Sequence, residues 1–155
     1  LNYAMSLHAY MTAKAAGFDE NMFLDAATRT YVEETGGANF LFVTKDGTVV
    51  TPKSESILPS ITRRSLVHIA EHILGMKVEE RPVAFAELHD FAEGGLCGTA
   101  AVISPVGSVT HKDEVIAFPS GMEHMGPVLQ KLYETLRGIQ LGTVEAPEGW
   151  IRKIC

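Results

Sequence analysis

The sequence predicts a mixed α/β domain of the α+β type. The chain has 155 residues, of which 46% are hydrophobic, so it can bury a core of ordinary domain size. Segments with helical spacing and segments with strand patterns follow one another without the regular alternation of a βαβ fold. No internal repeat, linker or low-complexity segment interrupts them, which favours one domain.

The first elements are a helix and two strand-rich runs. Residues 3–16 carry apolar side chains at helical spacing, and Gly17 follows as the expected C-terminal stop. The runs 21–34 and 38–52 are rich in aromatic and β-branched residues and therefore predict strands. The Asp46-Gly47 pair inside the second run predicts a hairpin turn.

A second helix and a further strand are predicted in the middle of the chain. Residues 62–75 place Leu, Ile and Ala side chains on one helical face, with Ser60 positioned as the N-cap and Gly75 at the end. The segment 76–83 reads as a strand, and 85–93 reads as a short helix.

The C-terminal third combines strands with a last helix. We expect one buried strand over 97–106, a hairpin over 108–118 and a helix over 126–138, which begins with a proline in its first turn. The tail, 145–155, is expected to be an extended arm that packs Trp150 against the domain.

Composition restricts the partners and the compartment. The chain carries 13 Lys+Arg against 19 Asp+Glu, a formal net charge of −6, so no nucleic acid or anionic membrane is expected to bind. No apolar run approaches the roughly 20 residues that span a bilayer. The two cysteines, Cys97 and Cys155, fit neither a metal site nor a disulfide framework, which favours the reducing cytoplasm. Since the chain opens on LNYAMSLH, with no initiator Met, we expect it to be part of a longer protein.

The stretch GGLCGTAAVISPVG, residues 94–107, begins its predicted strand with residues that have almost no side chain. One interpretation is close packing of two backbones. The other is an anion site, in which Thr99 offers a hydroxyl and an N–H group and Ala100 a second N–H group. The residues of this stretch alone leave both interpretations open.

Two further stretches could bind a ligand. In LPSITRR, residues 58–64, the N–H groups of Ile61 and Thr62 fall in the first helical turn, where no intrahelical partner exists and where the helix dipole favours a phosphate. In the strand ending at Glu33 and Glu34, alternation turns one carboxylate inward, where a protonated pyridine ring would be a suitable partner. The competing interpretation is a solvated acidic pair at a strand end.

The histidines and Cys97 carry less information. His68 and His72 stand four residues apart, but the order HIAEH does not match the zinc motif H-E-x-x-H, so no metal is expected. Cys97, beside a glycine, is interpreted as a small buried side chain and not as a nucleophile.

Five motifs follow one another along the chain: NYA (2–4), EETGGANFLFV (33–43), ILPSITRRSL (57–66), CGTAAVISPVGSV (97–109) and LYETLRGIQLG (132–142). Taken in this order, they resemble the C-terminal half of the branched-chain amino acid aminotransferases, which are fold type IV enzymes that depend on pyridoxal 5′-phosphate. The resemblance covers essentially the whole chain. The resemblance implies the large C-terminal domain of that fold, a sheet or pseudo-barrel surrounded by helices.

The resemblance also implies roles for individual residues. Glu34 would hydrogen-bond the pyridine nitrogen of the cofactor, Tyr3 would reach its phenolic oxygen, and Leu58 would pack on its ring. The phosphate would be held by the backbone N–H groups of Ile61 and Thr62 and by the hydroxyl of Thr99. The substrate would be bound by Gly37 together with the N–H groups of Thr99 and Ala100.

The family's cofactor-binding lysine lies five residues before the tyrosine of the NY motif, which here means upstream of Leu1. The N-terminal small domain is outside this chain as well. The resemblance therefore implies that residues 1–155 are the cofactor-binding domain and contain no catalytic residue, so we expect no activity from them alone. The complete protein would be a homodimer that transaminates leucine, isoleucine or valine with 2-oxoglutarate.

Two alternatives remain open at this point. The chain could belong to another fold type IV enzyme, a D-amino-acid aminotransferase or an aminodeoxychorismate lyase. It could also be a non-catalytic module that binds a phosphorylated ligand.

Overall fold

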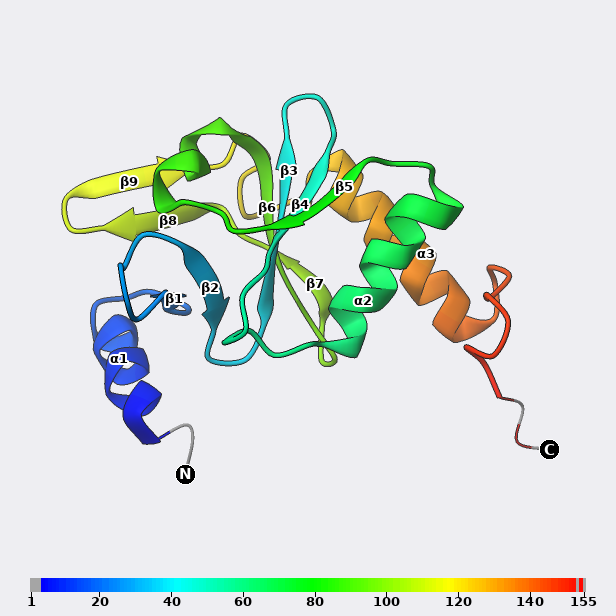
Figure 1. Ribbon diagram of the computed structural model, residues 1–155, viewed down its shortest axis with the longest axis horizontal. Helices are drawn as coiled ribbons and strands as arrows, with labels where there is room; N and C mark the ends of the chain where they lie inside the picture. Colours follow the sequence, from blue (N-terminus) through cyan, green and yellow to red (C-terminus); the bar gives the residue numbers. More distant parts are fainter. Residues whose placement is uncertain (1–3, 153, 155) are drawn as a thin grey trace.

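A β-sheet with helices on one face organises the chain (Figure 1). The computed structural model describes residues 4–152 and 154, so the predicted cofactor contact Tyr3 lies outside the described residues. The sheet strands are β1 (Met22–Leu24), β2 (Val32–Thr35), β3 (Asn39–Thr44), β4 (Val49–Pro52), β5 (Val78–Arg81), β6 (Phe91–Gly98) and β7 (Val102–Pro105). The remaining elements are α1 (Ala4–Ala15), α2 (Ile61–His68), the π-helix η1 (Ile69–Ile73), the 3₁₀ helix η2 (Phe85–Asp90), the hairpin β8 (Ser108–His111) and β9 (Glu114–Ala117), and α3 (Pro127–Leu141).

Strand β3 is the centre of the sheet. Its one edge pairs antiparallel with β6 along its whole length, from Asn39 opposite Cys97 to Thr44 opposite Phe91. Its other edge is shared: β2 pairs with its first residue, and β4 pairs with Phe42 and Val43 near its end. Strand β1 extends the sheet beyond β2, β5 runs parallel to β4, and β7 lies outside β6.

The sheet is open and does not close into a barrel. Among the described strands, β1, β5 and β7 each pair on one side only. The mixed α/β prediction is confirmed, but the helices α2 and α3 cover one face and do not surround the sheet. The predicted hairpin between β3 and β4 is also confirmed, and Gly47 supplies the positive φ of +85° that the turn requires.

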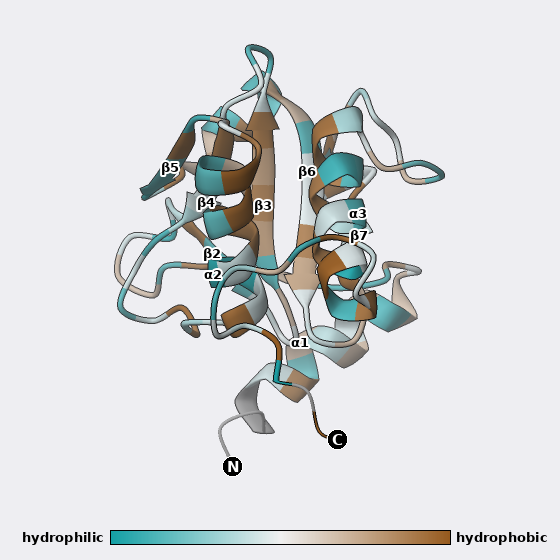
Figure 2. Ribbon diagram, turned by 90° about the vertical axis from the view of Figure 1, so that its right-hand side faces the viewer, coloured by the Kyte–Doolittle hydropathy of each residue, from teal (hydrophilic) through white to brown (hydrophobic). Residues whose placement is uncertain are grey.

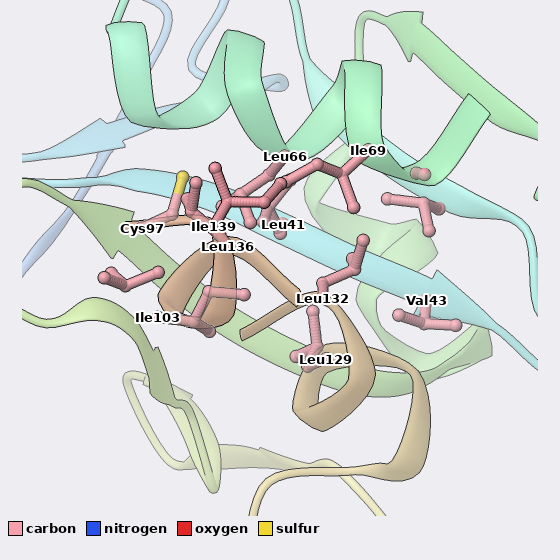
Figure 3. Close-up of a cluster of buried hydrophobic side chains, with 13 residues drawn as sticks. Leu41, Val43, Leu66, Ile69, Cys97, Ile103, Leu129, Leu132, Leu136 and Ile139 are labelled. Atoms are coloured by element: carbon pink, nitrogen blue, oxygen red, sulfur yellow. The ribbon is translucent and has the colours of Figure 1, made fainter. Parts of the chain in front are cut away.

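The main core lies between the sheet and the two helices. Figure 2 shows α2 and α3 side by side over β3 and β6, with their hydrophobic sides toward the strands. Figure 3 shows the side chains that meet there. They come from alternate residues of β3, from β6 and β7, from one face of α2 and η1, and from one face of α3. The labelled ones are Leu41, Val43, Leu66, Ile69, Cys97, Ile103, Leu129, Leu132, Leu136 and Ile139.

A second, aromatic core covers the opposite face of the sheet. The intervening residues of β3, Phe40 and Phe42, point to this side, where the ring of Phe42 stacks on that of Phe91 with 4.9 Å between centroids. The η2 helix and the β8–β9 hairpin close it through Leu88 and Ile116, which are both buried. The predicted hairpin over 108–118 is therefore confirmed.

The prediction of one buried strand over 97–106 is wrong. The chain reverses at residues 99–101, so that β6 ends at Gly98 and β7 begins at Val102, and these two residues face each other in the antiparallel pair. Small side chains allow this tight reversal, in which Val102 has a positive φ of 63°. The left-handed region is strained for a β-branched residue and costs about 1–3 kcal/mol, which the burial of Val102 offsets.

The helical predictions differ from the structure mainly at their ends. The short helix predicted over 85–93 stops at Asp90, and residues 91–93 belong to β6. The helix predicted over 62–75 turns into a π-helix at Ile69, and the last helix continues to Leu141.

In the described residues no helix is both long and apolar enough to cross a membrane. Trp150 packs as predicted, with its ring 5.2 Å from that of His68.

Candidate functional site

Three turns meet at one end of the sheet, the lower end in Figure 1. They are the β2–β3 turn (36–38), the loop that leads from β4 into α2 (53–60) and the β6–β7 turn (99–101). The meeting follows from the topology, because β2 and β6 both run antiparallel to β3 and so end where β3 begins. This end of the sheet therefore gathers the stretches that the sequence singled out.

Glu34, Asn39 and Cys97 form a row across three neighbouring strands. Glu34 is opposite Asn39 in the β2–β3 pair, and Asn39 is opposite Cys97 in the β3–β6 pair. Residues directly opposite each other share a face of the sheet. Cys97 belongs to the helix-side core, so the row lies on the face that carries α2.

The carboxylate of Glu34 has one oxygen engaged and one free. Its Oε2 accepts a hydrogen bond from Asn39 Nδ2 at 2.9 Å and another from the backbone N–H of Leu58 at 3.1 Å. Within residues 4–152 no group donates to its Oε1. The neighbouring Glu33 accepts from the Ser54 hydroxyl at 3.1 Å. The structure thus brings Glu34 and Leu58 together and leaves one half-buried acceptor for a ligand.

The β2–β3 turn is held by Thr35 and lies against the end of β6. The Thr35 hydroxyl oxygen accepts from the N–H groups of Gly37 at 3.3 Å and Ala38 at 3.0 Å, and it donates to the Ala38 carbonyl at 3.1 Å. A Cβ added to Gly98 would lie 3.5 Å from the Gly37 carbonyl oxygen. Gly37 therefore neighbours the β6–β7 turn, whose Thr99 is exposed.

The start of α2 presents unpaired amides. Ser60 caps the helix, accepting at Oγ from the N–H of Arg63 at 3.2 Å, and its carbonyl receives the first helical hydrogen bond from Arg64. The N–H groups of Ile61 and Thr62 precede that bond and have no partner in the helix. The first turn contains no acidic side chain, so its positive end remains available to an anion such as phosphate.

The third part of the site is the exposed β6–β7 turn at residues 99–101. Thr99 and Ala100 are both exposed, and the side chain of Ala100 leaves its backbone open to a ligand. An oxyanion could therefore meet the Thr99 hydroxyl or the amides of this turn without steric hindrance. Ile61 and Leu58 are also 71% and 64% exposed, so the apolar walls of the site face solvent.

Two residues that fix the site were missed by the sequence interpretation. Asn39 is buried between Glu34 and Leu58. Arg63 is buried as well, and its Nη1 donates to Glu80 at 3.0 Å and to the Pro52 carbonyl at 3.4 Å, tying α2 to β4 and β5. For Asn39 the available signal was a polar residue at the start of the apolar run NFLFV, where a buried amide needs hydrogen-bond partners. Arg63 lies in the polar stretch SITRRS, and nothing there marked it as buried.

A cavity of about 490 Å³ lies on the other face of the sheet. It is bounded by α1 and β1 on one side and by β7 and β8 on the other. Thr35 and Phe40 line it. Because adjacent strand residues point to opposite faces, these side chains face away from Glu34 and Asn39. The cavity is therefore separate from the site at the sheet end.

The remaining residues that the sequence offered for chemistry are Cys97, His68 and His72. Burial raises the pKa of the Cys97 thiol to about 12, so the thiol stays protonated and behaves as a core side chain, as predicted. The rings of His68 and His72 lie 4.5 Å apart on α2 and η1. Across the described part of the chain, no three His, Cys, Asp or Glu side chains are grouped to hold a metal ion.

The chain is similar to known proteins in both sequence and fold. The profile of the family described as amino-transferase class IV matches residues 1–109. The branched-chain-amino-acid aminotransferase of Haemophilus influenzae is 50% identical over 158 residues, covering 99% of this chain and 46% of that protein. This chain thus spans just under half the length of that relative.

The similar solved structures are also branched-chain amino acid aminotransferases. The branched-chain amino acid aminotransferase from Thermobaculum terrenum in its PLP-form has a TM-score of 0.79 and 35% identity, covering 91% of this chain and 43% of its own. The T.th. branched-chain amino acid aminotransferase (below, the T.th. enzyme) has a TM-score of 0.83 and 34% identity, covering 96% of this chain and 47% of its own. Its structures hold N-(5′-phosphopyridoxyl)-L-glutamate in one case and 4-methylvaleric acid in another.

Proposed function

This chain belongs to the amino-transferase class IV family, and we propose that the complete protein transfers the amino group of leucine, isoleucine or valine to 2-oxoglutarate with pyridoxal 5′-phosphate as cofactor. The proposal concerns the complete protein because the chain spans less than half of its relatives. Within it, residues 1–155 would be the cofactor-binding domain. From the same resemblance we propose that the complete protein is a homodimer.

The donor set at the sheet end fits this cofactor. The free Oε1 of Glu34 can accept from a protonated ring nitrogen, while Oε2 is held in place by Asn39 and Leu58. The amides of Ile61 and Thr62, at the positive end of α2, suit a phosphate group. One end of the site therefore matches a cation and the other an anion, which are the two ends of this ligand.

Each group in the site has a distinct task in the proposed reaction. When bound, pyridoxal phosphate supplies an electron-withdrawing ring that stabilises negative charge at the substrate Cα. Glu34 keeps the ring nitrogen protonated and so maintains that property. The Thr99 hydroxyl and the α2 amides hold the phosphate. Gly37 and Ala100, without bulk, leave room for the substrate carboxylate near the exposed turns.

The ligands of a relative support the proposed substrates. The T.th. enzyme binds 4-methylvaleric acid, which has the carbon skeleton of leucine. It also binds N-(5′-phosphopyridoxyl)-L-glutamate, in which the cofactor is joined to glutamate. This chain is 34% identical to that enzyme. The two ligands therefore support a branched-chain amino acid as the amino donor and 2-oxoglutarate as the acceptor of this protein.

The observation that carries the proposal is the Glu34 carboxylate, held at one oxygen and open at the other, beside the loop that enters α2. The test is an amino-donor panel with the purified complete protein and 2-oxoglutarate. We expect glutamate from leucine, isoleucine and valine and none from D-alanine. Preferential use of D-alanine, or pyruvate release from aminodeoxychorismate, would assign the protein to another activity.

The 155-residue chain by itself is expected to form no glutamate. The resemblance places the cofactor lysine five residues before Tyr3, and two residues precede Tyr3 here. Among the described lysines, Lys14 lies over the Tyr10 ring and Lys77 pairs with Glu79 at 2.6 Å, so neither is directed to the site. Leucine-dependent glutamate formation by this chain would contradict the expectation.

A further inference from the structure

We propose that Asn39 is a positioning residue, which aims the Glu34 carboxylate at the cofactor ring nitrogen and joins it to the phosphate-binding start of α2. The inference rests on the proposed function and goes beyond it by adding a residue that touches neither cofactor nor substrate. Asn39 is 4% exposed and opens β3, whose next four residues are apolar. A buried amide in that place requires hydrogen-bond partners.

Both amide protons of Asn39 have acceptors. Its Nδ2 lies 2.9 Å from Glu34 Oε2 and 3.3 Å from the Leu58 carbonyl oxygen. The backbone of Asn39 is fixed independently, because it pairs with Glu34 on one side and with Cys97 on the other. The side chain therefore projects from a backbone position that is paired on both sides toward Glu34 and the loop that carries Leu58.

The hydrogen bond from Asn39 to Glu34 decides which oxygen of the carboxylate remains open to a ligand. Oε2 accepts from both Asn39 Nδ2 and the Leu58 N–H, and this pair of bonds fixes the plane of the carboxylate. Oε1 is then presented with its orientation already set, so binding loses less side-chain entropy. Without Asn39 a single bond from Leu58 remains, and the carboxylate can rotate about it.

The same amide connects the acid to the phosphate-binding helix. The N–H of Leu58 donates to Glu34, and the carbonyl of Leu58 accepts from the Asn39 side chain. Because Asn39 also donates to Glu34, the three residues form one closed ring of hydrogen bonds. The Leu58 carbonyl also accepts from the N–H of Ser60 at 2.8 Å, and Ser60 caps α2. The ring anchor and the phosphate anchor are thus held at a fixed separation, which a rigid ligand carrying both groups requires.

The test uses the complete protein and pyridoxamine 5′-phosphate labelled with ¹⁵N in its ring, a cofactor form that needs no lysine. Calorimetry gives the Kd, and the ring ¹⁵N resonance reports directly whether the nitrogen carries a proton. The variants are Asn39→Ala, Glu34→Gln and the double variant. The matched control is Thr51→Val, which removes another buried hydrogen bond of the sheet, from Thr51 Oγ1 to the Phe40 carbonyl at 2.8 Å.

In the wild type we expect a protonated ring nitrogen. Asn39→Ala weakens binding about tenfold and shifts the ring titration to lower pH, because the carboxylate no longer faces the nitrogen in one orientation. Thr51→Val leaves both readouts within about twofold of the wild type. In the Glu34→Gln background Asn39→Ala changes the ring signal no further, since Asn39 acts on it through Glu34.

Two kinds of failure are distinguishable. A wild-type protein that binds no pyridoxamine 5′-phosphate, or binds it with a neutral ring, overturns the proposed function. If wild type behaves as expected and Glu34→Gln loses the ring proton, but Asn39→Ala alters neither Kd nor the ring signal, only the inference about Asn39 is overturned.

A wild-type measurement covers the case in which Asn39→Ala does not fold. The side-chain N–H protons of Asn39 are followed by NMR while pyridoxamine 5′-phosphate is added, and again with an analogue whose ring nitrogen is replaced by C–H. We expect the Asn39 signals to move with the first ligand and much less with the analogue. Equal movement with both ligands would contradict coupling between Asn39 and the ring nitrogen.

Discussion

The carboxylate of Glu34 accepts a hydrogen bond from the backbone N–H of Leu58, with 3.1 Å between Oε2 and the nitrogen, although the two residues are 24 positions apart. Leu58 stands three residues before the first residue of α2. This bond joins an acid at the end of β2 to the approach of a helix whose first amides are open. One end of the sheet thus holds a carboxylate that suits a cation and helix amides that suit an anion.

Replacing Glu34 by Gln is predicted to lower kcat of the complete enzyme by about a hundredfold or more, the scale of a lost charge stabilisation in an active site. The amide cannot keep the ring nitrogen protonated, while the size of the side chain is preserved. Steady-state kinetics with leucine check this. Glu33→Gln is the matched control, because Glu33 contacts Ser54 and not Leu58; a similar loss in both variants would remove the special role of Glu34.

Replacing Thr99 by Val is predicted to raise the Kd for pyridoxamine 5′-phosphate about tenfold or more, because a hydrogen bond to a charged phosphate contributes about 1.5–3 kcal/mol. Thr99→Ser keeps the hydroxyl and should bind within about threefold of the wild type. Thr99 is exposed in a turn, so neither variant disturbs the core. Calorimetry that found the two variants equal would show that the hydroxyl does not hold the phosphate.

Replacing Glu93 by Ala is predicted to lower the free energy of unfolding by about 2–4 kcal/mol. The buried Glu93 carboxylate accepts from the N–H groups of Val128 at 3.1 Å and Leu129 at 2.9 Å, in the first turn of α3. The variant leaves two helix amides without an acceptor. Urea unfolding of the 155-residue chain measures the change. Glu123 is exposed, so Glu123→Ala should leave the free energy of unfolding unaltered within about 0.5 kcal/mol.

The Cys97 thiol is predicted to resist alkylation in the folded protein. Its pKa is raised from 9.0 to about 12 by burial, which lowers the thiolate fraction at pH 8 by roughly a thousandfold. In a Cys155→Ser variant, iodoacetamide should label the chain only after denaturation. Rapid labelling of the native variant, followed by mass spectrometry, would show that Cys97 is accessible and not part of the core.

Patterns local in the sequence predicted most of the elements. The apolar periodicity of α3, the Asp46-Gly47 turn and the Ser60 cap depend on neighbouring residues, and all three are confirmed. The reversal at residues 99–101 was missed, because Thr99 to Ala101 could equally start a buried strand. Only the pairing of β6 with both β3 and β7 makes it a turn.

The same limit applies to the site. Glu34, Leu58 and the start of α2 were singled out from motifs, and the structure brings Glu34 and Leu58 into contact. Asn39 and Arg63 were not predicted, since each has a partner that is distant in sequence: Leu58 for Asn39, and Glu80 for Arg63. A buried polar side chain signals that a partner exists, but which partner it meets depends on strand order.

The central claim is that the open oxygen of Glu34, the α2 amides and the 99–101 turn bind one phosphorylated ring. Backbone amide shifts on addition of pyridoxamine 5′-phosphate to the complete protein test it most directly. We predict that Glu34, Ile61, Thr62, Thr99 and Ala100 shift together with a single Kd, and that pyridoxamine without phosphate leaves Ile61 and Thr62 unmoved. Shifts confined to the cavity between β1 and β8, with these five residues unchanged, would contradict the claim.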